Sequence, residues 1–567
     1  MAHKSVYPMK RFLSIFFVLF TLGAALAQEA DYQRKYESGK ELLKGGKYEL
    51  AKELFRPLMQ EAEGNRYAAY AHYFFALSSL KTNKPDEARL ALQQLLQKFP
   101  DWPDADNAHY LLANVAFEKK DYPGAFAYLE KVRSKPVKED GENLKRHYAQ
   151  ATTAKALKEL QKRYPDDQVL ATVLVDKLTL STDPEDLELA RQLDEKFKLN
   201  RAEQITESAQ TEKKDAYNVA LLLPFNYNQL VSDKSARNNQ LAVDMFNGIQ
   251  LAQQKLAEEG VKVNLLAYDI GNDADPMLKL INQPDFAASD LLVGPLYGST
   301  IKAALAFAGQ RRIGQVNPIT NNGQILQNNP VAYLFQPSVE SQARYAANYA
   351  LQTFPVKTAV ILWGASARDS TLAHHYRKFF TEGGGKVLAF KKMAQPTVGQ
   401  MEAALTGYDE TKLGHIFIPS TQQNVAINFM SVMEKNFEAM PVITMSNWLD
   451  YHMINYDQYE RHNVHFIFPE FVDYRKPEVI AFKQAYVAKR NLIPSIYAYQ
   501  GYELMMRFGR ALGEYGTNFH AGLQGKPAEP GILMPGFHYN GSNDNQYVPL
   551  IKFQNADLVL ANPIEMK

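Results

Sequence analysis

Residues 39–58 read GKELLKGGKYELAKELFRPL, and the stretches ALSSLKTNKPDEARLALQQL at 76–95 and ANVAFEKKDYPGAFAYLEKV at 113–132 repeat their pattern at intervals of 37 residues. Each stretch opens on a small residue, has a second small residue twelve positions later, and then has two larger apolar residues. These sets are Gly39, Ala76 and Ala113; Ala51, Ala88 and Ala125; Phe55, Leu92 and Leu129; and Leu58, Leu95 and Val132. Small residues let antiparallel helices approach closely, and large ones fill the space between hairpins. The pattern therefore predicts three stacked helical hairpins over residues 28–135, with an irregular helical bundle as the alternative.

The spacing resembles that of tetratricopeptide repeats, which also favour residues such as Asp86, Asp121 and Tyr122 in the turn between helices. The period of 37 departs from the family's usual value of about 34, so we expect longer helices or connections. The resemblance implies a scaffold whose concave face, lined by the first helix of each repeat, holds a protein partner. Tyr36, Tyr73 and Tyr110 lie on these first helices, and packing between repeats explains them as readily as partner contact.

The segments around the repeats have distinct patterns. Lys10 and Arg11 precede an apolar stretch from Phe12 that ends in Ala25-Leu26-Ala27, which predicts a secretory signal peptide over residues 1–27. An uncleaved N-terminal anchor is the alternative. Residues 136–200 keep helical spacing without the register, and we expect further helical repeats that cap the array. The polar stretch at 201–216 is predicted to be a linker.

Composition limits the classes of function. The chain has 567 residues, 46% of them hydrophobic, which is enough for two or three cores. Its formal net charge of +1 gives no global field that would hold nucleic acid. No cysteine is present, which excludes disulfides and the acylated cysteine of a bacterial lipoprotein. Together with the signal peptide, these features predict an exported protein of a Gram-negative periplasm or the periplasmic face of the outer membrane.

From residue 217 to 567 short apolar runs alternate with amphipathic helices. The predicted strands are 219–223, 261–268, 291–293, 313–316, 359–363, 387–390, 415–418, 442–445 and 464–468. Strands separated by helices of this length need right-handed crossovers and form parallel sheets covered on both faces. Since one core stops growing at about 250 to 300 residues, we expect two lobes.

This stretch resembles the type I periplasmic binding proteins of the branched-chain amino-acid receptor kind. The matching segments are NVALLLP at 218–224, NGIQLA at 247–252, LVGPLYGS at 292–299, NPIT at 317–320, FQPS at 335–338 and YAYQGYE at 497–503. The resemblance implies two Rossmann-like lobes joined by three crossings. Lobe one would comprise about 217–337 and 473–535, and lobe two about 338–472 and 536–567.

Ligands of open parallel sheets lie beyond the carboxyl ends of the strands, here between the lobes. The residues expected to contact a ligand from lobe one are Phe225, Ser299, Thr300 and Thr320, and those from lobe two are Ser420, Thr421, Asn447 and Trp448. The alternative for each is an ordinary helix cap or core residue. Amino-acid receptors of this family normally supply an acidic side chain from lobe two, where this chain has Asn447 and then Asp450, which puts amino-acid binding in doubt.

The sequence offers no persuasive catalytic or metal-binding arrangement. His462 and His465 have the spacing of metal ligands but no third ligand nearby, and His374 and His375 point in different directions on a helix. The glycines at 383–385 follow a helix and precede a strand, the reverse of the order in a phosphate loop. We therefore expect a protein that is not an enzyme and that has no cofactor.

Helical repeats followed by a type I binding domain resemble the architecture of the outer-membrane activators of penicillin-binding proteins. This resemblance implies a cell-envelope scaffold that binds a protein partner, such as a peptidoglycan synthase, and a cleft for a small polar ligand. The alternative is the substrate-binding protein of an ABC-type uptake system for an amino acid or another small polar solute.

Overall fold

The computed structural model describes residues 28–565 except 151, 180, 182, 202–212, 228–232, 272, 328, 395 and 409–410. The predicted signal peptide at 1–27 and most of the predicted linker lie outside the described residues. The chain divides into two compact units, residues 1–173 and 174–567. Each unit is described by itself.

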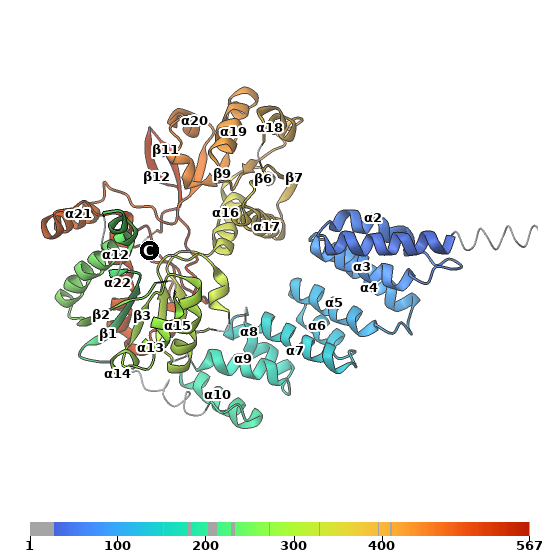
Figure 1. Ribbon diagram of the computed structural model, residues 1–567, viewed down its shortest axis with the longest axis horizontal. Coiled ribbons are helices and arrows are strands. Elements are labelled where there is room, and N and C mark those ends of the chain that lie inside the picture. The colour runs from blue at the N-terminus through green and yellow to red at the C-terminus, as the bar shows by residue number, and fades with distance from the viewer. Residues whose placement is uncertain are drawn as a thin grey trace, which may run out of the picture. The chain divides into compact units, whose positions relative to one another are not determined.

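In the described residues of the first unit, all regular secondary structure is helical (Figure 1). A helix over 28–44 is followed by α2 (Tyr48–Leu58), α3 (Ala68–Lys81), α4 (Pro85–Lys98), α5 (Ala105–Glu118), α6 (Tyr122–Leu129), α7 (Lys135–Gln150), α8 (Ala154–Arg163) and the start of α9 (Gln168–Leu178). The helices pack in sequential antiparallel pairs, and the small repeat positions Ala51, Ala76, Ala88, Ala113 and Ala125 all have an exposed fraction of 0%. The prediction of a tetratricopeptide-like solenoid is confirmed.

Two features of the repeats follow directly from the sequence pattern. A Cβ atom at Gly39 would lie 2.7 Å from the ring of Phe55, so the first hairpin needs a glycine where its helices cross. Tyr36 is buried, with its ring centroid 4.5 Å from that of Tyr67, and Tyr73 packs against Phe74 and Trp102. These contacts agree with packing as the role of both tyrosines.

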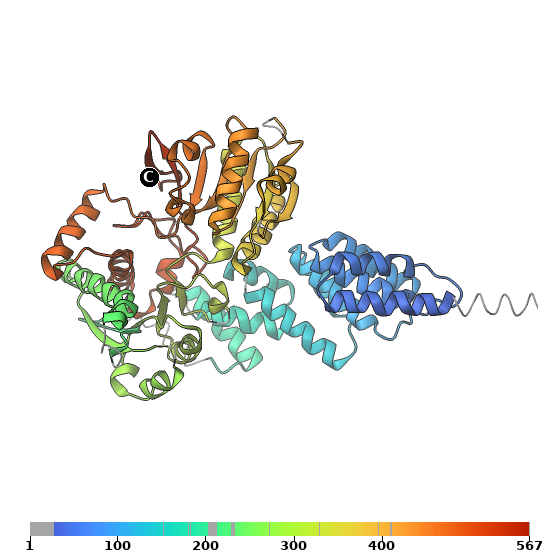
Figure 2. The same cartoon turned by 45° about the horizontal axis from the view of Figure 1, so that its top comes forward.

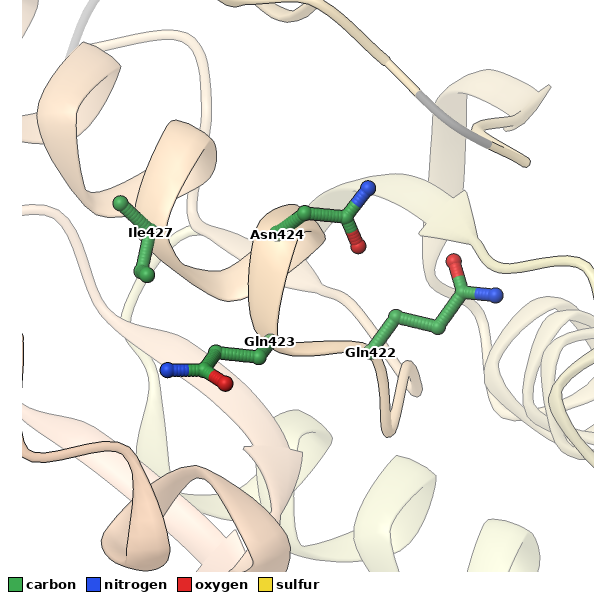
Figure 3. Close-up of a pocket in the computed structure, with 4 residues that line it drawn as sticks. All are labelled: Gln422, Gln423, Asn424 and Ile427. Carbon is green, nitrogen blue, oxygen red and sulfur yellow. The ribbon is translucent and has the colours of Figure 1, made fainter.

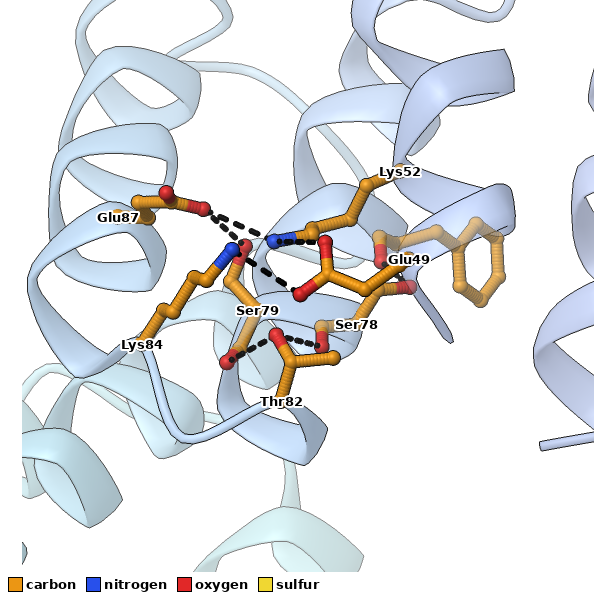
Figure 4. Close-up of polar contacts among 8 residues, drawn as sticks. Glu49, Lys52, Ser78, Ser79, Thr82, Lys84 and Glu87 are labelled. Carbon is orange, nitrogen blue, oxygen red and sulfur yellow. Dashed lines mark hydrogen bonds and ion pairs between the residues drawn. The ribbon is translucent and has the colours of Figure 1, made fainter. Parts of the chain in front are cut away.

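Ion pairs connect neighbouring repeats (Figure 4). Lys52 of α2 has a side chain only 4% exposed, and its Nζ atom lies 3.0 Å from Glu49 and 3.1 Å from Glu87 of α4. Glu49 also pairs with Lys84, 3.0 Å away. One repeat later, Asp86 occupies the position of Glu49 and pairs with Lys119. The same kind of contact therefore fixes successive hairpins.

The second unit begins with the end of α9 and with α10 (Pro184–Phe197), and then forms a five-stranded parallel sheet in the order β2-β1-β3-β4-β5 (Figure 2). Its strands are β1 (Tyr217–Leu223), β2 (Val263–Asp269), β3 (Leu291–Val293), β4 (Gly314–Asn317) and β5 (Ala332–Leu334). One face packs on α12 (Asp233–Glu258), α21 (Pro477–Arg490) and α22 (Ile496–Tyr515), and the other on α13 (Ala274–Leu280), α14 (Pro284–Ala287) and α15 (Gly298–Arg311). We call this part lobe one.

Helices α12 and α22 cross in direct backbone contact. A Cβ atom at Gly248 would lie 2.0 Å from the carbonyl oxygen of Ala498, and one at Gly501 would lie 2.3 Å from that of Met245. Only glycine fits at these two positions, which explains why both matching segments of the sequence contain one. The crossing ties residues near 500 to the strands of lobe one.

The second sheet has seven strands in the order β12-β11-β10-β9-β8-β6-β7, and we call this part lobe two. Its parallel strands are β6 (Thr358–Trp363), β7 (Lys386–Lys392), β8 (His415–Phe417), β9 (Val442–Met445) and β10 (Val464–Ile467). One face packs on α16 (Val339–Thr353) and α17 (Ala367–Glu382), and the other on α18 (Val398–Leu405), α19 (Gln423–Asn436) and α20 (Tyr456–Arg461). The two-lobed α/β fold that the sequence predicted is confirmed.

The strands differ from the sequence prediction at two places. β5 was not expected, and neither was the antiparallel hairpin of β11 (Leu550–Gln554) and β12 (Asp557–Leu560), which extends the sheet at β10. Both strands of this hairpin are short, and the turn at Asn555 and Ala556, where φ is positive at both residues, lacks glycine. The sheet of lobe two is therefore mixed rather than entirely parallel.

Buried carboxylates hold the crossings between the lobes. Asp544 accepts hydrogen bonds from the backbone N–H of Ser338 at 2.9 Å and from the hydroxyls of Ser338 and Ser341 at 2.6 Å, so it joins the first crossing to the last. Glu503 of α22 accepts from the N–H groups of Ile532 and Leu533, at 2.8 and 2.5 Å. These bonds fix the path of the connecting segments.

Candidate ligand-binding site

The predicted residues of lobe one lie at the carboxyl edge of its sheet, on the loops after β1 and β4 and in the first turn of α15 after β3. Strands β1, β3 and β4 are neighbours, so the segments that carry Phe225, Ser299 and Thr320 are adjacent. Buried Asn317 joins two of these loops, because its Nδ2 donates to Pro295 at 2.7 Å and its Oδ1 accepts from the N–H of Thr320 at 2.8 Å. Phe225 and Thr320 are half-buried, and Ser299 is exposed in the first turn of α15.

Thr300 differs from the expectation that its hydroxyl faces a ligand. Its exposed fraction is 0%, and the hydroxyl donates to the carbonyl oxygens of Tyr297 at 3.0 Å and Gly271 at 3.4 Å. The residue secures the start of α15 because helix geometry turns it inward, one position beyond the exposed Ser299. Ser299 is therefore exposed to solvent, whereas the Thr300 hydroxyl is buried.

In lobe two the loops after β8 and β9 contact each other. Buried Trp448 donates from Nε1 to the carbonyl oxygen of Ser420 at 2.6 Å, and the Tyr451 hydroxyl donates to the carbonyl of Thr421. Trp448 and Ser420 both have an exposed fraction of 0%, whereas Thr421 is half-buried and Asn447 is exposed. Trp448 was expected to form an apolar wall for a ligand, but its large ring instead packs in the core against Phe429.

A pocket of about 520 Å³ adjoins Thr421 at the start of α19. It is lined by Gln422, Gln423, Asn424 and Ile427, and Figure 3 shows the amide ends of Gln422 and Asn424 on one side of the chain and those of Gln423 on the other. The N–H of Gln422 donates to the Ser420 hydroxyl oxygen at 3.3 Å, which connects this pocket to the predicted site. Its lining offers uncharged donors and acceptors.

The sequence analysis did not identify Asp369, a buried carboxylate that follows strand β6 at the carboxyl edge of the sheet in lobe two. Asp369 is 1% exposed, and neither carboxylate oxygen has a hydrogen-bond partner of normal geometry among the described residues. It lies in the first turn of α17, against Gly364 and the hydroxyl of Ser420, since a Cβ atom at Gly364 would lie 2.2 Å from Asp369 Oδ2 and 2.8 Å from Ser420 Oγ. Burial raises the pKa of this carboxyl, partly offset by the hydroxyl and N–H of Ser366.

Arg368 and Glu470 extend this charged group. Burial lowers the pKa of Arg368, an effect opposed by the charges of Glu470 and Asp369, and burial raises the pKa of Glu470. The guanidinium also donates to Gln342 Oε1 at 3.3 Å. Asp450, the acid that the sequence pointed to, is exposed, whereas Asp369 after β6 is buried and Glu470 after β10 is half-buried.

The residues that were considered for metal binding have structural contacts. His462 lies 2.9 Å from Glu434, and His465 lies 3.0 Å from the Tyr349 hydroxyl. Among the described residues, no group of three or more potential protein ligands could hold a metal ion. None of the helices in that part of the chain combines the length and apolar character needed to span a membrane.

The two-lobed α/β fold and the polar residues at the carboxyl edges of its sheets are typical of a binding domain, which here follows a helical-repeat array. The profile of the periplasmic binding protein family matches residues 230–547, more than half of the chain, and a tetratricopeptide-repeat profile matches residues 73–138. The chain belongs to the periplasmic binding protein family and carries tetratricopeptide repeats in front of the binding domain.

Several solved structures are similar to parts or most of the chain. A putative branched-chain amino acid ABC transporter from Rhodospirillum rubrum is 14% identical, with 61% of this chain and 99% of that one covered and a TM-score of 0.48. An ABC transporter substrate-binding protein from Desulfitobacterium hafniense in complex with Leu is 16% identical, with 61% and 99% covered and a TM-score of 0.42. Full-length LpoA from Haemophilus influenzae is 13% identical, with 94% and 95% covered and a TM-score of 0.47. A comparison with curated protein sequences gives no significant match.

Proposed function

We propose that this protein is a non-catalytic scaffold of the bacterial cell envelope, in which the repeat array binds a protein partner and the two-lobed domain binds a ligand or a second partner. The observation that carries the proposal is the array itself, with its repeats in register and connected by ion pairs. Uptake of a small solute needs only the two-lobed domain, whereas an array of stacked repeats is suited to holding another macromolecule.

The partner surface that we propose is the concave face formed by the first helices. In the third repeat we assign to this face Asn107 and Tyr110 of α5, which are about one turn apart and both half-buried. Their side chains combine an amide and a phenol with remaining accessible area, a composition typical of protein interfaces.

The partner that we propose is a peptidoglycan synthase, and the location is the periplasm or the periplasmic face of the outer membrane. The support is the membership in the periplasmic binding protein family, the predicted signal peptide and the joining of an array to a binding domain. In this role the chain catalyses no reaction and acts by holding the synthase.

Crosslinking in cells, followed by purification and mass spectrometry, tests this proposal. We expect the full chain to capture a peptidoglycan synthase, and we expect Asn107→Arg combined with Tyr110→Arg to lose it. Leu90→Arg is the matched control, because Leu90 is 53% exposed on the second helix of a repeat.

Three outcomes would contradict parts of the proposal. Capture of a different envelope protein would reject the synthase but keep the scaffold. Unchanged capture by the double variant would reject the concave face. The absence of any stable protein partner would reject the scaffold itself.

A solute receptor is the second candidate, and two features of lobe two favour it, the buried carboxylate of Asp369 and the amide-lined pocket at the start of α19. A ligand that binds only the folded protein raises its stability by RT ln(1 + [L]/Kd). We would therefore screen the full chain by thermal shift against amino acids, peptides and cell-wall fragments. A hit that Thr320→Ala and Asp369→Asn weaken, but Ser431→Ala on the exposed side of α19 does not, would support this candidate.

A further inference from the structure

Residues 341–401 of lobe two carry a large excess of positive charge. They contain eight lysines and arginines and only two acidic residues, Asp369 and Glu382, which gives a formal charge of +6 in a chain whose total is +1. Asp369 is buried, so Glu382 is the only acid of this segment with an exposed side chain. A surface with one sign of charge attracts oppositely charged groups and speeds their association.

Four of these cations lie at strand β7 and at helix α17, which packs on one face of it. Lys386, Lys391 and Lys392 are exposed along β7 itself. Arg377 of α17 lies over the ring of Phe390, with its Cζ atom 4.8 Å from the ring centroid. None of the four forms an ion pair with another described residue. Their charges are therefore available to a partner.

Strand β7 is the end strand of its sheet, and its outer edge pairs with no other strand among the described residues (Figure 1). The N–H of Met393 donates to the carbonyl oxygen of Trp363 in β6 at 2.7 Å, so the alternation of a strand directs the N–H and C=O groups of Phe390 and Lys392 away from β6. The apolar residues at 387–390 are half-buried, whereas the inner strands β8 and β9 are buried throughout. This edge combines backbone hydrogen-bonding groups, apolar surface and cations.

A hollow of about 450 Å³ adjoins the carboxyl end of β7. Its walls include Lys391 and Lys392 together with the apolar side chains of Met393, Pro396 and Ala404. Apolar walls beside two cations suit a segment in which apolar and acidic residues alternate, because neighbouring side chains of a strand point to opposite faces.

We propose that the outer edge of β7 binds an extended acidic segment of a partner protein, which adds to the sheet as a further strand. Main-chain hydrogen bonds supply affinity in this mode of recognition, and the cations select carboxylates. Lysines on an edge strand discourage pairing with uncharged or basic strands, so the same side chains favour an acidic one. This surface is separate from the array, and the inference does not depend on the partner proposed for the array.

Fluorescence anisotropy with the full chain and a labelled peptide of four Glu-Val repeats tests the proposal. We expect saturable binding that weakens as the salt concentration rises, because exposed charges are screened. A peptide of four Lys-Val repeats should not bind. An acrylate oligomer with the same number of carboxylates should bind at least about tenfold more weakly, since it has no backbone N–H groups to pair with the strand.

A pair of charge variants locates the binding surface. Lys391→Glu combined with Lys392→Glu should raise the Kd of the Glu-Val peptide by at least about tenfold. The matched control is Lys483→Glu combined with Lys489→Glu, which makes the same change in net charge at exposed positions of α21 in lobe one, and it should leave the Kd within about twofold. All four side chains are exposed, so unchanged thermal melting is expected and shows that both variants fold.

Four results would overturn the proposal. The Glu-Val peptide could fail to bind, or bind the β7 variant as tightly as the control variant. Equal binding of the acrylate oligomer would mean that charge alone acts and that no strand is added. Binding of phosphatidylglycerol vesicles that the β7 variant abolishes, without binding of the peptide, would assign this basic surface to a membrane.

Discussion

Three buried histidines, His415, His465 and His520, lie beside tyrosine hydroxyls. His415 Nε2 lies 2.5 Å from the hydroxyl oxygen of Tyr376, and His520 Nδ1 lies 2.9 Å from that of Tyr333. His465 forms a hydrogen bond with the hydroxyl of Tyr349. Burial lowers the pKa of His415 and of His520 to about 3 and that of His465 to about 4, from an ordinary value of 6.5. All three rings are therefore neutral in the folded protein at neutral pH.

We predict that the free energy of unfolding falls as the pH is lowered below 6.5. The folded pKa values are lower than those of the unfolded chain, so between these values the unfolded state binds more protons and gains stability. At pH 5 each histidine should cost roughly 2 kcal/mol relative to pH 7.

Urea unfolding at pH 7, 6 and 5 measures this loss. His415→Gln should remove its share of the pH dependence, while His374→Gln, at an exposed position, should not. A free energy of unfolding that stays constant between pH 7 and pH 5 would contradict the assignment of these three rings as neutral and buried.

At the scale of single residues the sequence predicted which loops carry the site but not which side chains remain accessible. Thr300 and Trp448 follow strands as expected, yet both are buried, because burial depends on the turn of one helix and on the packing of neighbouring loops. Asp369 was missed because its only local signal is a carboxylate in the first turn after Ser366, which is typical of an ordinary helix start. Its surroundings include the nearby Gly364 and also Ser420, which is distant in sequence.

At the scale of elements the crossing of α12 and α22 limits what lobe one tolerates. We predict that Gly248→Ala lowers the free energy of unfolding by about 3 kcal/mol or more, because the new methyl group would meet backbone that cannot move aside. Gly399→Ala in α18 is the control, since nothing lies within 4 Å of its Cβ position, and it should be neutral or stabilising by about 0.5 to 1 kcal/mol. Chemical unfolding of both variants measures the difference, and an equal effect would refute the close approach.

The ion pairs of the array give a second prediction at this scale. Lys52→Gln should destabilise α2 and α4 by about 2 kcal/mol, because Glu49 and Glu87 lose the buried ammonium that lies between them. Lys47→Gln, at an exposed position before α2, should change stability by less than about 0.5 kcal/mol. Hydrogen exchange of the amides in α2 and α4 reports the change, and equal protection in the two variants would show that Lys52 stabilises nothing.

The elements themselves were largely predictable where a periodic pattern spans many residues. The three repeats and most parallel strands belong to this group. β5 and the hairpin of β11 and β12 do not, because strands of three to five residues carry little periodicity, and the turn at Asn555 and Ala556 has no glycine to mark a hairpin. The antiparallel direction of this hairpin follows from its short turn.

At the scale of the whole molecule two modules of different chemistry share one chain. The helices of the array are connected by ion pairs between neighbouring repeats. The two-lobed domain has polar loops, an amide-lined pocket and a buried carboxylate. The division of the chain into two compact units is compatible with the separate roles that we propose for them. In the function that we propose, the array holds the protein partner and the polar edge of the lobes does not.

The most direct test of this claim is the Kd between the purified full chain and the partner captured by crosslinking, measured for three variants side by side. We predict that Asn107→Arg with Tyr110→Arg raises this Kd by at least about tenfold, a loss of roughly 1.4 kcal/mol or more, while Thr320→Ala and Leu90→Arg leave it within about twofold. A Kd that rises for Thr320→Ala and stays unchanged for the variant of α5 would contradict the account.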